Sequence, residues 1–496
     1  MPKLSKDTIA NIVWKACDSF RGTLDSGAYK DYILTMLFVK YISDFHKQRR
    51  TELLAEHKGN ESRVKAVLKL QKFVLDETAT FDYLLAQKES ANLGELINTA
   101  LSKIEDDNPD KLRGVFRGVD FNDKDALGNA KERNALLKNL LEDFADSRLD
   151  LRPENLESDD CLGDAYEYLI AKFAESAGKK GGEFYTPGEV STLLARLVAP
   201  SDGVSVYDPA CGSGSLLIKV AKESKGRNYG LWGQEKNGQT HALCKMNMYL
   251  HEVNDAKIEW GDTIRNPLHT QGGRLQTFDI VVANPPFSLD KWGEEVAQND
   301  AFSRFELGVP PKSKGDYAFI LHMINSLNSR GTMGVILPHG VLFRGASEGK
   351  IRQRLIEQNL LHAVIGLPSN LFFGTSIPAC ILVFKRQRTD TSVLFIDGSK
   401  DYEKGKNQNK LTADNVAKIL RAYNERTNAP KYAHLASFDE IKANEFNLNI
   451  PRYVDSFEDE ESIDLSATKT ELCALETELH AVQKQMQGFL DELGVK

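Results

Sequence analysis

Several features of common protein classes are missing from this 496-residue sequence. No segment approaches twenty consecutive apolar residues, and the opening "MPKLSKDTIANIV" lacks the apolar core of a secretory signal. Only six cysteines occur, and none forms a C-x-x-C pair, so a disulfide framework or a cysteine-rich zinc site is not predicted. We therefore expect a soluble, cytoplasmic protein with reduced thiols and no membrane contact.

The sequence also lacks an excess of positive charge. Its net charge is −8, whereas proteins that bind nucleic acid unaided are usually basic because they must neutralise phosphates. If nucleic acid is the substrate, local patches or a partner subunit must hold most of it. No cluster of histidine, cysteine and acidic residues in the sequence requires a metal, so the predicted site contains none.

Three regions are distinguished by the spacing of their apolar residues. Residues 1–155 show helical spacing, as in Ile9, Ile12, Val13, Ala16 and Phe20, which predicts an all-α N-terminal domain. Over residues 156–456, short apolar runs alternate with helical stretches, which predicts an α/β domain with a mainly parallel, doubly wound sheet. The expected strands are "VSVY" at 204, "YGLWGQ" at 229, "KIEW" at 257, "DIVVA" at 279, "TMGVIL" at 332, "HAVIGL" at 362, "CILVF" at 380 and "SVLFI" at 392.

Two further expectations concern the end of the chain. The strands at 380 and 392 are joined by "KRQRTDT", which is too short for a crossover helix, so we expect them to be antiparallel neighbours at a sheet edge. Residues 457–496 begin with the acidic linker "FEDEES" and then predict a C-terminal helix with a heptad seam, which fits contact with a partner better than packing on its own chain. The seam residues are Leu472, Leu475, Leu479, Val482, Met486, Phe489 and Leu493.

The first motif with chemical content is "VSVYDPACGSGSLLIKVAK", residues 204–222. Gly212 and Gly214 allow a ligand to approach the backbone, but the motif has neither the full G-x-G-x-x-G pattern nor the G-K-[ST] of a P-loop. A ligand that carries a cationic amino group needs a carboxylate here, and Asp208 is placed to supply it. A glycine-rich turn of this kind is weak evidence when it stands alone.

Two acidic residues extend this motif. Glu235 follows the next expected strand and is placed to accept hydrogen bonds from ribose hydroxyls. Asp262, in "EWGDTI", is placed to meet the amino group of an adenine ring. An amino acid, a ribose and an adenine together make S-adenosylmethionine. The alternative is three unrelated turns at strand ends, and their occurrence in this order argues against it.

The second motif, "DIVVANPPF", ends an apolar strand with Asn284, Pro285, Pro286 and Phe287. An amine attached to an aromatic ring is a poor nucleophile because its lone pair is delocalised into the ring. The Asn284 side-chain oxygen and the Pro285 carbonyl can accept both N–H hydrogens and favour a lone pair that faces a methyl donor, while Phe287 stacks on the base. A base in a duplex must be flipped out to reach such a site. The plainer alternative is a stiff turn plugged by a phenylalanine.

In this order, "DPACGSGS", "GDTI" and "NPPF" resemble the amino-methyltransferases that modify adenine in DNA, which have a Rossmann-like, class I S-adenosylmethionine-dependent sheet. The resemblance extends over nearly the whole chain to HsdM, the modification subunit of type I restriction–modification systems. It rests on "SFRGTLDSGAYKDYILTMLFVKYISD", "GVILPHGVLFRG" and "LPSNLFFGTSIPACILVFKR". It implies that "GGEFYTPGEVSTLLARLV" covers the methionine part of the cofactor. The cofactor residues implied are Glu183, Phe184, Tyr185, Thr186, Pro187, Asp208, Gly212, Ser213, Gly214, Ser215, Glu235 and Asp262.

The resemblance also implies partners. In that family two modification subunits pair with one specificity subunit that reads double-stranded DNA, and a restriction subunit can join them. The C-terminal helix is then expected to dock on the specificity subunit, which accounts for the acidic charge of a chain without a base-reading domain. Lys312, Lys314 and Arg344 are candidates for phosphate contacts, although each fits a solvated charge better.

The predicted reaction is methyl transfer from S-adenosylmethionine to the exocyclic N6 amine of a flipped adenine. Two alternatives remain open at this point. The same Asn-Pro-Pro-aromatic motif serves methyltransferases of RNA and of protein glutamine, although those enzymes are usually shorter. The second alternative is a non-catalytic scaffold for a specificity subunit, and the intact Asn284 and cofactor loop argue against it.

Overall fold

The computed structural model describes residues 3–21, 24–177, 185–224, 228–456 and 465–494. The chain forms two compact units, residues 1–455 and residues 456–496. None of the helices in the described ranges carries an apolar stretch long enough to cross a membrane.

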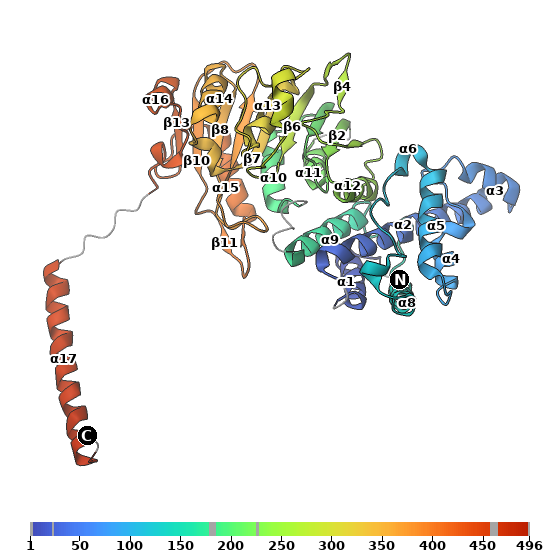
Figure 1. Cartoon of the computed structure of the whole chain (residues 1–496), viewed down its shortest axis with the longest axis horizontal. Coiled ribbons are helices and arrows are strands. Elements are labelled where there is room, and N and C mark those ends of the chain that lie inside the picture. Colours follow the sequence, from blue (N-terminus) through green and yellow to red (C-terminus); the bar gives the residue numbers. More distant parts are fainter. Residues whose placement is uncertain (1–2, 22–23, 178–184, 225–227, 457–464, 495–496) are drawn as a thin grey trace. The chain divides into compact units, whose positions relative to one another are not determined.

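The N-terminal part of the first unit is helical, as predicted (Figure 1). The apolar residues that predicted its first two helices, including Ile9, Phe20 and Ile33, are buried in one core. The helices are α1 (Lys6–Ala16), α2 (Ser26–Glu56), α3 (Glu61–Leu68), α4 (Phe81–Ala86), α5 (Leu93–Asp107), α6 (Pro109–Leu112), α7 (Lys124–Leu127), α8 (Ala130–Phe144) and α9 (Cys161–Ala177). Short 3-10 turns lie at Cys17–Ser19, Glu77–Ala79 and Pro153–Asn155.

A nine-stranded sheet follows, with the strand order β13-β10-β8-β9-β7-β6-β1-β2-β3. Its strands are β1 (Val204–Asp208), β2 (Tyr229–Glu235), β3 (Lys257–Trp260), β6 (Phe278–Ala283), β7 (Leu327–Pro338), β8 (Leu361–Gly366), β9 (Ala379–Lys385), β10 (Val393–Asp397) and β13 (Ala433–Ala436). Two small hairpins lie outside it, β4 (Thr270–Gln271) with β5 (Arg274–Leu275), and β11 (Glu403–Lys404) with β12 (Asn409–Lys410). All eight predicted strands are present, and five of the eight pairings in the sheet are parallel.

Helices cover both faces of this sheet (Figure 1). Alternate strand residues enter two separate cores: Val206, Ile280 and Ile381 lie in one, and Tyr207, Val281 and Leu382 lie in the other. Burial on both faces explains why these strands are continuous apolar runs. The first face is covered by α10 (Gly188–Val198), α11 (Ser215–Glu223), α12 (Gly238–Leu250) and α15 (Ala413–Glu425), and the second by α13 (Asp316–Asn325), α14 (Ala346–Glu357) and α16 (Phe438–Ala443). Further 3-10 turns lie at Glu294–Asn299, His339–Leu342 and Ile450–Arg452.

The expected pairing of the strands at 380 and 392 is wrong, although their antiparallel direction is confirmed. β8 lies between them: β9 is antiparallel to β8 and to β7, and β10 is parallel to β8. Their short connection crosses the start of β8, where the Arg388 guanidinium donates hydrogen bonds to the carbonyls of Leu361 and Ser392. The edge beyond β10 is formed by β13, which pairs with it in the antiparallel direction.

Helix α12 joins the helical region to the sheet. Leu243, Met246 and Tyr249 on one side of it belong to the core of the N-terminal helices, while Cys244 and Met248 on another side belong to a core of the sheet. The Tyr249 ring lies 5.5 Å from the Phe73 ring, edge to face, and its hydroxyl donates a 2.9 Å hydrogen bond to the Lys111 carbonyl. The two parts of the first unit are therefore packed through a shared helix.

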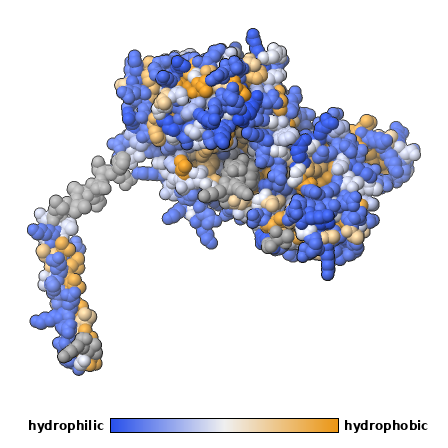
Figure 2. All heavy atoms as spheres, viewed as in Figure 1, coloured by the Kyte–Doolittle hydropathy of each residue, from blue (hydrophilic) through white to orange (hydrophobic). Residues whose placement is uncertain are grey.

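The second unit contains α17 (Leu465–Glu492). The predicted seam residues within and just after it are all exposed, from 55% for Val482 to 76% for Leu493. Figure 2 shows apolar residues along this helix beside hydrophilic ones. The seam is thus open to solvent in this chain, as a surface for a partner would be.

The packing of Tyr249 gives a first prediction. Tyr249→Ala should lower the free energy of unfolding by about 3–5 kcal/mol, because it opens a cavity between the two regions. Tyr249→Phe keeps the ring and loses only the hydrogen bond to Lys111, which is worth about 0.5–1.5 kcal/mol. Urea unfolding of both variants measures the difference, and equal losses would contradict the shared packing.

Candidate active site

Three polar groups meet at the carboxyl edge of the sheet. β1 pairs in parallel with both β2 and β6, so these three strands end side by side at Asp208, at Glu235 and at Ala283, which is followed by the third polar residue, Asn284. The chain continues from β1 to β2 and β3 on one side and returns to β6 on the other. Such a reversal of strand order creates a crevice in which doubly wound sheets bind ligands.

The loop after β1, residues 208–215, is shaped by two glycines in the left-handed region. Gly212 has φ +55° and Gly214 has φ +79°. A β-carbon on Gly214 would lie 2.6 Å from Met248 Cε and 2.7 Å from Cys244 Sγ, so no other residue fits there without movement. Gly214 caps α11, and the Ser213 and Ser215 hydroxyls lie 3.1 Å apart at its start. The sequence therefore places a tight backbone loop at the strand end, as predicted.

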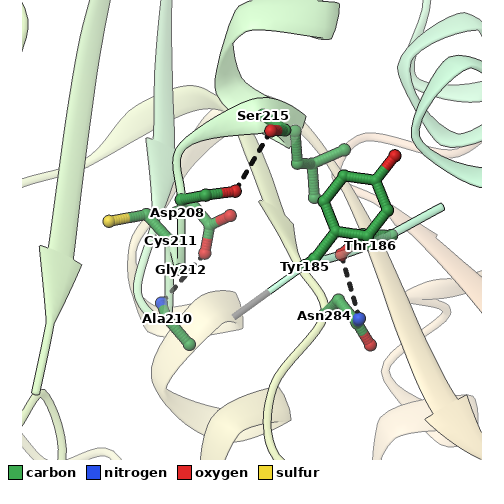
Figure 3. A pocket seen from close by; sticks show the side chains of 10 residues that line it. Tyr185, Thr186, Asp208, Ala210, Cys211, Gly212, Ser215 and Asn284 are labelled. Carbon is green, nitrogen blue, oxygen red and sulfur yellow. Dashed lines mark hydrogen bonds between the residues drawn. The ribbon is translucent and has the colours of Figure 1, made fainter. Parts of the chain in front are cut away.

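This loop forms one wall of a cavity with about 340 Å³ of empty space, open solvent included (Figure 3). Seven of the predicted site residues line it and are brought together from three segments of the chain. They are Tyr185, Thr186, Asp208, Gly212, Ser213, Ser215 and Asn284, joined by Ala210, Cys211 and Leu216, which were not predicted. The side chains of Ala210, Cys211 and Leu216 are small or apolar, so only their position in or next to the loop could have indicated that they line a site.

Asp208 is a buried carboxyl group in this cavity. Loss of hydration raises its pKa from 3.8 to about 8, although the Ala210 N–H donates a 2.9 Å hydrogen bond to it. Glu235 lies nearby, accepts 3.0 Å and 2.7 Å hydrogen bonds from the Gly212 and Asn237 N–H groups, and has a pKa raised by its own burial. Asp208 lines the cavity and Glu235 binds the backbone of its loop, and two partly dehydrated carboxyl groups so close together favour a cationic ligand.

Asp262 does not line this cavity. Its Oδ1 accepts hydrogen bonds from the N–H groups of Ile264 and Arg265, and its Oδ2 lies 2.9 Å from Lys236 Nζ and 3.0 Å from Arg265 Nη1. Burial acts to raise its pKa, but these hydrogen bonds prevail and hold the pKa below its ordinary value. The Asp262 carboxylate thus already has four donors. Its contact with the amino group of an adenine remains a prediction.

The nitrogen and the oxygen of the Asn284 side-chain amide differ in their hydrogen bonding. Its Nδ2 donates a 3.0 Å hydrogen bond to Thr186 Oγ1, whereas its Oδ1 is buried and has no partner among the described residues (Figure 3). Thr186 precedes α10, and Pro187 caps that helix, so a segment far from β6 in sequence orients this amide. The result is a free carbonyl oxygen held at the cavity.

The rest of the Asn-Pro-Pro-Phe turn is fixed from behind. Pro285 is buried, Pro286 is exposed, and the half-buried Phe287 ring meets the Phe372 ring edge to face at 5.7 Å. The next residue, Ser288, has φ +51° and donates a 2.8 Å hydrogen bond from its N–H to Asp316 Oδ1. These contacts restrict the turn that follows the catalytic candidate.

Asp316 is a supporting residue that motif analysis missed. It is fully buried and pairs with the Arg344 guanidinium, which also contacts Glu348 at 2.6 Å. Arg344 was a candidate for phosphate contact, and the structure instead gives it two buried carboxylate partners. Lys312 lies 3.2 Å from Glu294 but is 65% exposed. The predicted Glu183 and Phe184 lie outside the described residues.

A doubly wound sheet with these groups at its switch point defines the class of S-adenosylmethionine-dependent methyltransferases. The sequence model of the N-6 DNA methylase family matches residues 157–462, and that of the HsdM N-terminal domain matches residues 9–144. The chain belongs to the N-6 DNA methylase family, and within it to the methylase subunits of type I restriction enzymes, which makes it an adenine-specific DNA methyltransferase.

Individual relatives agree with this assignment. The chain is 32% identical to the type I restriction enzyme MpnII methylase subunit of Mycoplasma pneumoniae, over 91% of this chain and 90% of that protein. It is 33% identical to the MjaVIII methylase subunit of Methanocaldococcus jannaschii, over 99% of this chain and 85% of that protein. The crystal structure of a type I methyltransferase subunit from Streptococcus thermophilus superposes with a TM-score of 0.83 at 36% identity, covering 91% of this chain and all of that one.

The dehydrated carboxyl of Asp208 gives a prediction for stability against pH. The folded protein keeps this group protonated up to about pH 8, whereas the unfolded chain ionises it near its ordinary pKa of 3.8. The contribution to stability is therefore present at low pH and is lost as the pH rises from about 4 to 8, by up to ~1.4 kcal/mol per pH unit.

Asp208→Asn carries no ionisable group and should lack this loss. Thermal unfolding in the absence of cofactor, from pH 5 to pH 8, should show the wild type losing stability relative to the variant as the pH increases. Glu235 is present in both proteins, so the difference between them reports Asp208 together with its interaction with Glu235. Parallel curves for the two proteins would contradict the dehydrated state of Asp208.

Proposed function

We propose that the cavity binds S-adenosylmethionine and that Asn284 presents an adenine amine to its methyl group. The cavity residues fit this cofactor because the carboxyl group of Asp208 has no cationic partner in the described parts of the chain and the cofactor carries an ammonium group. Gly212 lines the cavity and leaves the backbone of the loop open to a close ligand, and Glu235 is placed for ribose hydroxyls. When bound, the cofactor supplies an electrophilic methyl carbon on a positively charged sulfur.

The observation that carries the proposal is the unpartnered Oδ1 of Asn284. Because Thr186 accepts the hydrogen bond from Nδ2, the amide is oriented with its oxygen free to accept an N–H of the substrate amine. The Pro285 carbonyl is the proposed second acceptor. Together they favour a nitrogen lone pair that is no longer shared with the ring, so that positioning, not a strong base, supplies the rate.

We propose that the substrate is an adenine flipped from double-stranded DNA, with Phe287 as the stacking surface. The Phe372 contact holds this ring in place, which reduces the entropy lost when a base stacks on it. Pro286 is exposed beside it and is the residue most open to a base. RNA and glutamine side chains are less favoured substrates, because the family of this chain methylates DNA.

We further propose that α17 docks on a specificity subunit that reads the DNA sequence, with a second copy of this chain on the same subunit and a restriction subunit as a possible addition. The support is the exposed seam, which has the spacing for contact with another helix. A chain with a net charge of −8 also needs a partner to hold most of the DNA backbone.

Asn284→Ala tests the catalytic proposal. Loss of a preorganised hydrogen-bond acceptor should lower the rate of methyl transfer by at least about 100-fold, while binding of S-adenosylmethionine persists. Transfer of labelled methyl groups to DNA, by the chain assembled with its specificity subunit, gives the rate, and calorimetry gives the affinity. Thr186→Val should cause a smaller loss because the acceptor remains but is no longer oriented. Full activity of the alanine variant would refute the proposal.

Gly212→Val tests the cofactor site separately. A β-branched residue at φ +55° beside the cavity should abolish binding of S-adenosylmethionine in calorimetry. Gly272→Val is the matched control, because it has φ +58° in the exposed β4–β5 hairpin and open space around its β-carbon. Unchanged cofactor affinity in Gly212→Val would place the cofactor elsewhere.

The docking proposal predicts a further result. Leu475→Glu combined with Leu479→Glu puts two charges into the seam and should abolish co-purification with the specificity subunit. Cofactor binding should be unaffected, because the site lies in the other compact unit. Lys484→Glu makes the same total change in charge at a position away from the seam, and it should still co-purify. Retention of the subunit by the leucine variant would exclude the seam as the docking surface.

A further inference from the structure

We propose that this protein binds a divalent transition-metal cation, of which Zn²⁺ is the best match, between α9 and the end of α12. The ligands are one imidazole nitrogen of His251 and the carboxylates of Asp164 and Glu167. The ligand atoms of these three residues all lie within 4.8 Å of one another. This site is separate from the methyl-transfer cavity and does not depend on the function proposed for it.

Two elements create the site. Asp164 and Glu167 are three residues apart on α9, so their side chains lie on one face of that helix. His251 is the capping residue at the end of α12, and its ring packs against Gly163, where a β-carbon would come within 2.5 Å of the imidazole. Only glycine at this position lets the ring lie beside the acidic face of α9.

Within the part of the chain that the structure describes, the imidazole has no hydrogen-bond partner, which distinguishes this cluster from an ordinary group of surface charges. The His251 side chain is 1% exposed, and both of its ring nitrogens are buried without a partner there. Glu167 Oε1 is also buried and unpartnered, and it lies 3.9 Å from His251 Nε2. Burial of such groups without compensation is unfavourable, so a ligand that joins them stabilises the fold.

The distance between these two atoms suits a bridging cation better than a direct hydrogen bond. A hydrogen bond needs about 3 Å, whereas two ligand atoms of a tetrahedral zinc ion, each about 2.1 Å from the metal, lie roughly 3.4 Å apart. The most widely spaced pair in the cluster, at up to 4.8 Å, must approach by about 1.4 Å, which rotation of the two carboxylate side chains supplies. The ligands are thus gathered in the described geometry and close further around a bound ion.

The two lysines beside the cluster leave carboxylate oxygens of Asp164 and Glu167 available to the ion. Lys219 lies 3.6 Å from Glu167 Oε2, and Lys222 lies 2.8 Å from Asp164 Oδ1, so each lysine contacts one oxygen of its carboxylate. On the other side of the ring, Asp160 Oδ1 lies 3.7 Å from His251 Nδ1, which is longer than a hydrogen bond. An outer carboxylate that accepts a hydrogen bond from the second ring nitrogen commonly orients a metal-binding histidine, and a small rotation of Asp160 would supply one. An open cavity that includes Asp160 and His251 in its lining gives access from solvent.

The ligand types decide between metals. An imidazole with two carboxylates suits zinc and other divalent ions of the first transition row, whereas Mg²⁺ and Ca²⁺ prefer oxygen ligands alone. With three protein ligands, water completes the coordination. Because the ligands come from α9 and α12, the ion would tie the N-terminal helices to the sheet and increase the stability of that junction.

Zinc binding by the purified full-length chain, stripped of metal with a chelator, tests the proposal. The wild type should bind one more equivalent of Zn²⁺ per chain than His251→Leu, measured by calorimetry and by metal analysis after dialysis. Glu167→Gln, which keeps the size of the side chain, should weaken this equivalent at least tenfold. Zn²⁺ should also raise the melting temperature of the wild type, with reversal by chelator, and should do so much less in both variants.

Glu175→Gln is the matched control, because it removes an acidic group from the same helix outside the cluster and should bind zinc like the wild type. Binding through exposed histidines or Cys473 is common to all these proteins and cancels. If His251→Leu fails to fold, Glu167→Gln decides the question. Equal stoichiometry and affinity in the wild type and Glu167→Gln, or no zinc binding by the wild type, would overturn the proposal.

Discussion

The candidate active site depends on the hydrogen bond from the Asn284 amide to Thr186. This bond uses the nitrogen end of the amide and leaves the oxygen buried without a partner. An unsatisfied buried acceptor costs about 1–3 kcal/mol, so the fold maintains this arrangement against a local preference. For the proposed reaction this means that the acceptor would already be dehydrated and oriented before a substrate arrives, so that little reorganisation would remain.

Contacts on both sides of the turn after β6 hold the Asn284 amide in place. β6 is bonded on both sides within the sheet, and the turn after it is anchored through Ser288 to the fully buried Asp316. Asp316 is in turn neutralised by Arg344, which Glu348 holds from the next helix. A buried carboxylate without its cation is strongly unfavourable, so this chain of contacts resists displacement of the turn. The site is therefore rigid because of residues that do not touch the cavity.

Much of the fold and of the site could be predicted from the sequence. The eight strands were visible because burial on both faces requires continuous apolar runs, and Asp208 and Asn284 were visible because they directly follow such runs. The sequence did not show that β9 lies between β7 and β8, or that β8 lies between β9 and β10. A short connection can join two neighbouring strands or two strands that have one strand between them, and the sequence looks the same in both cases. Asp316 and the cluster around His251 were missed for a related reason. Their partners lie far away in sequence, or come together only when two helices pack.

The exposed seam of α17 has a consequence for the balance of protein levels in the cell. A helix of 28 residues is about 42 Å long, and its apolar side chains gain nothing until another surface covers them. Chains made in excess of the partner would leave these leucines free to associate with one another or to be captured by chaperones and proteases. A copy without its partner would therefore be the one that is degraded. Synthesis of the subunits in matched amounts would avoid this loss.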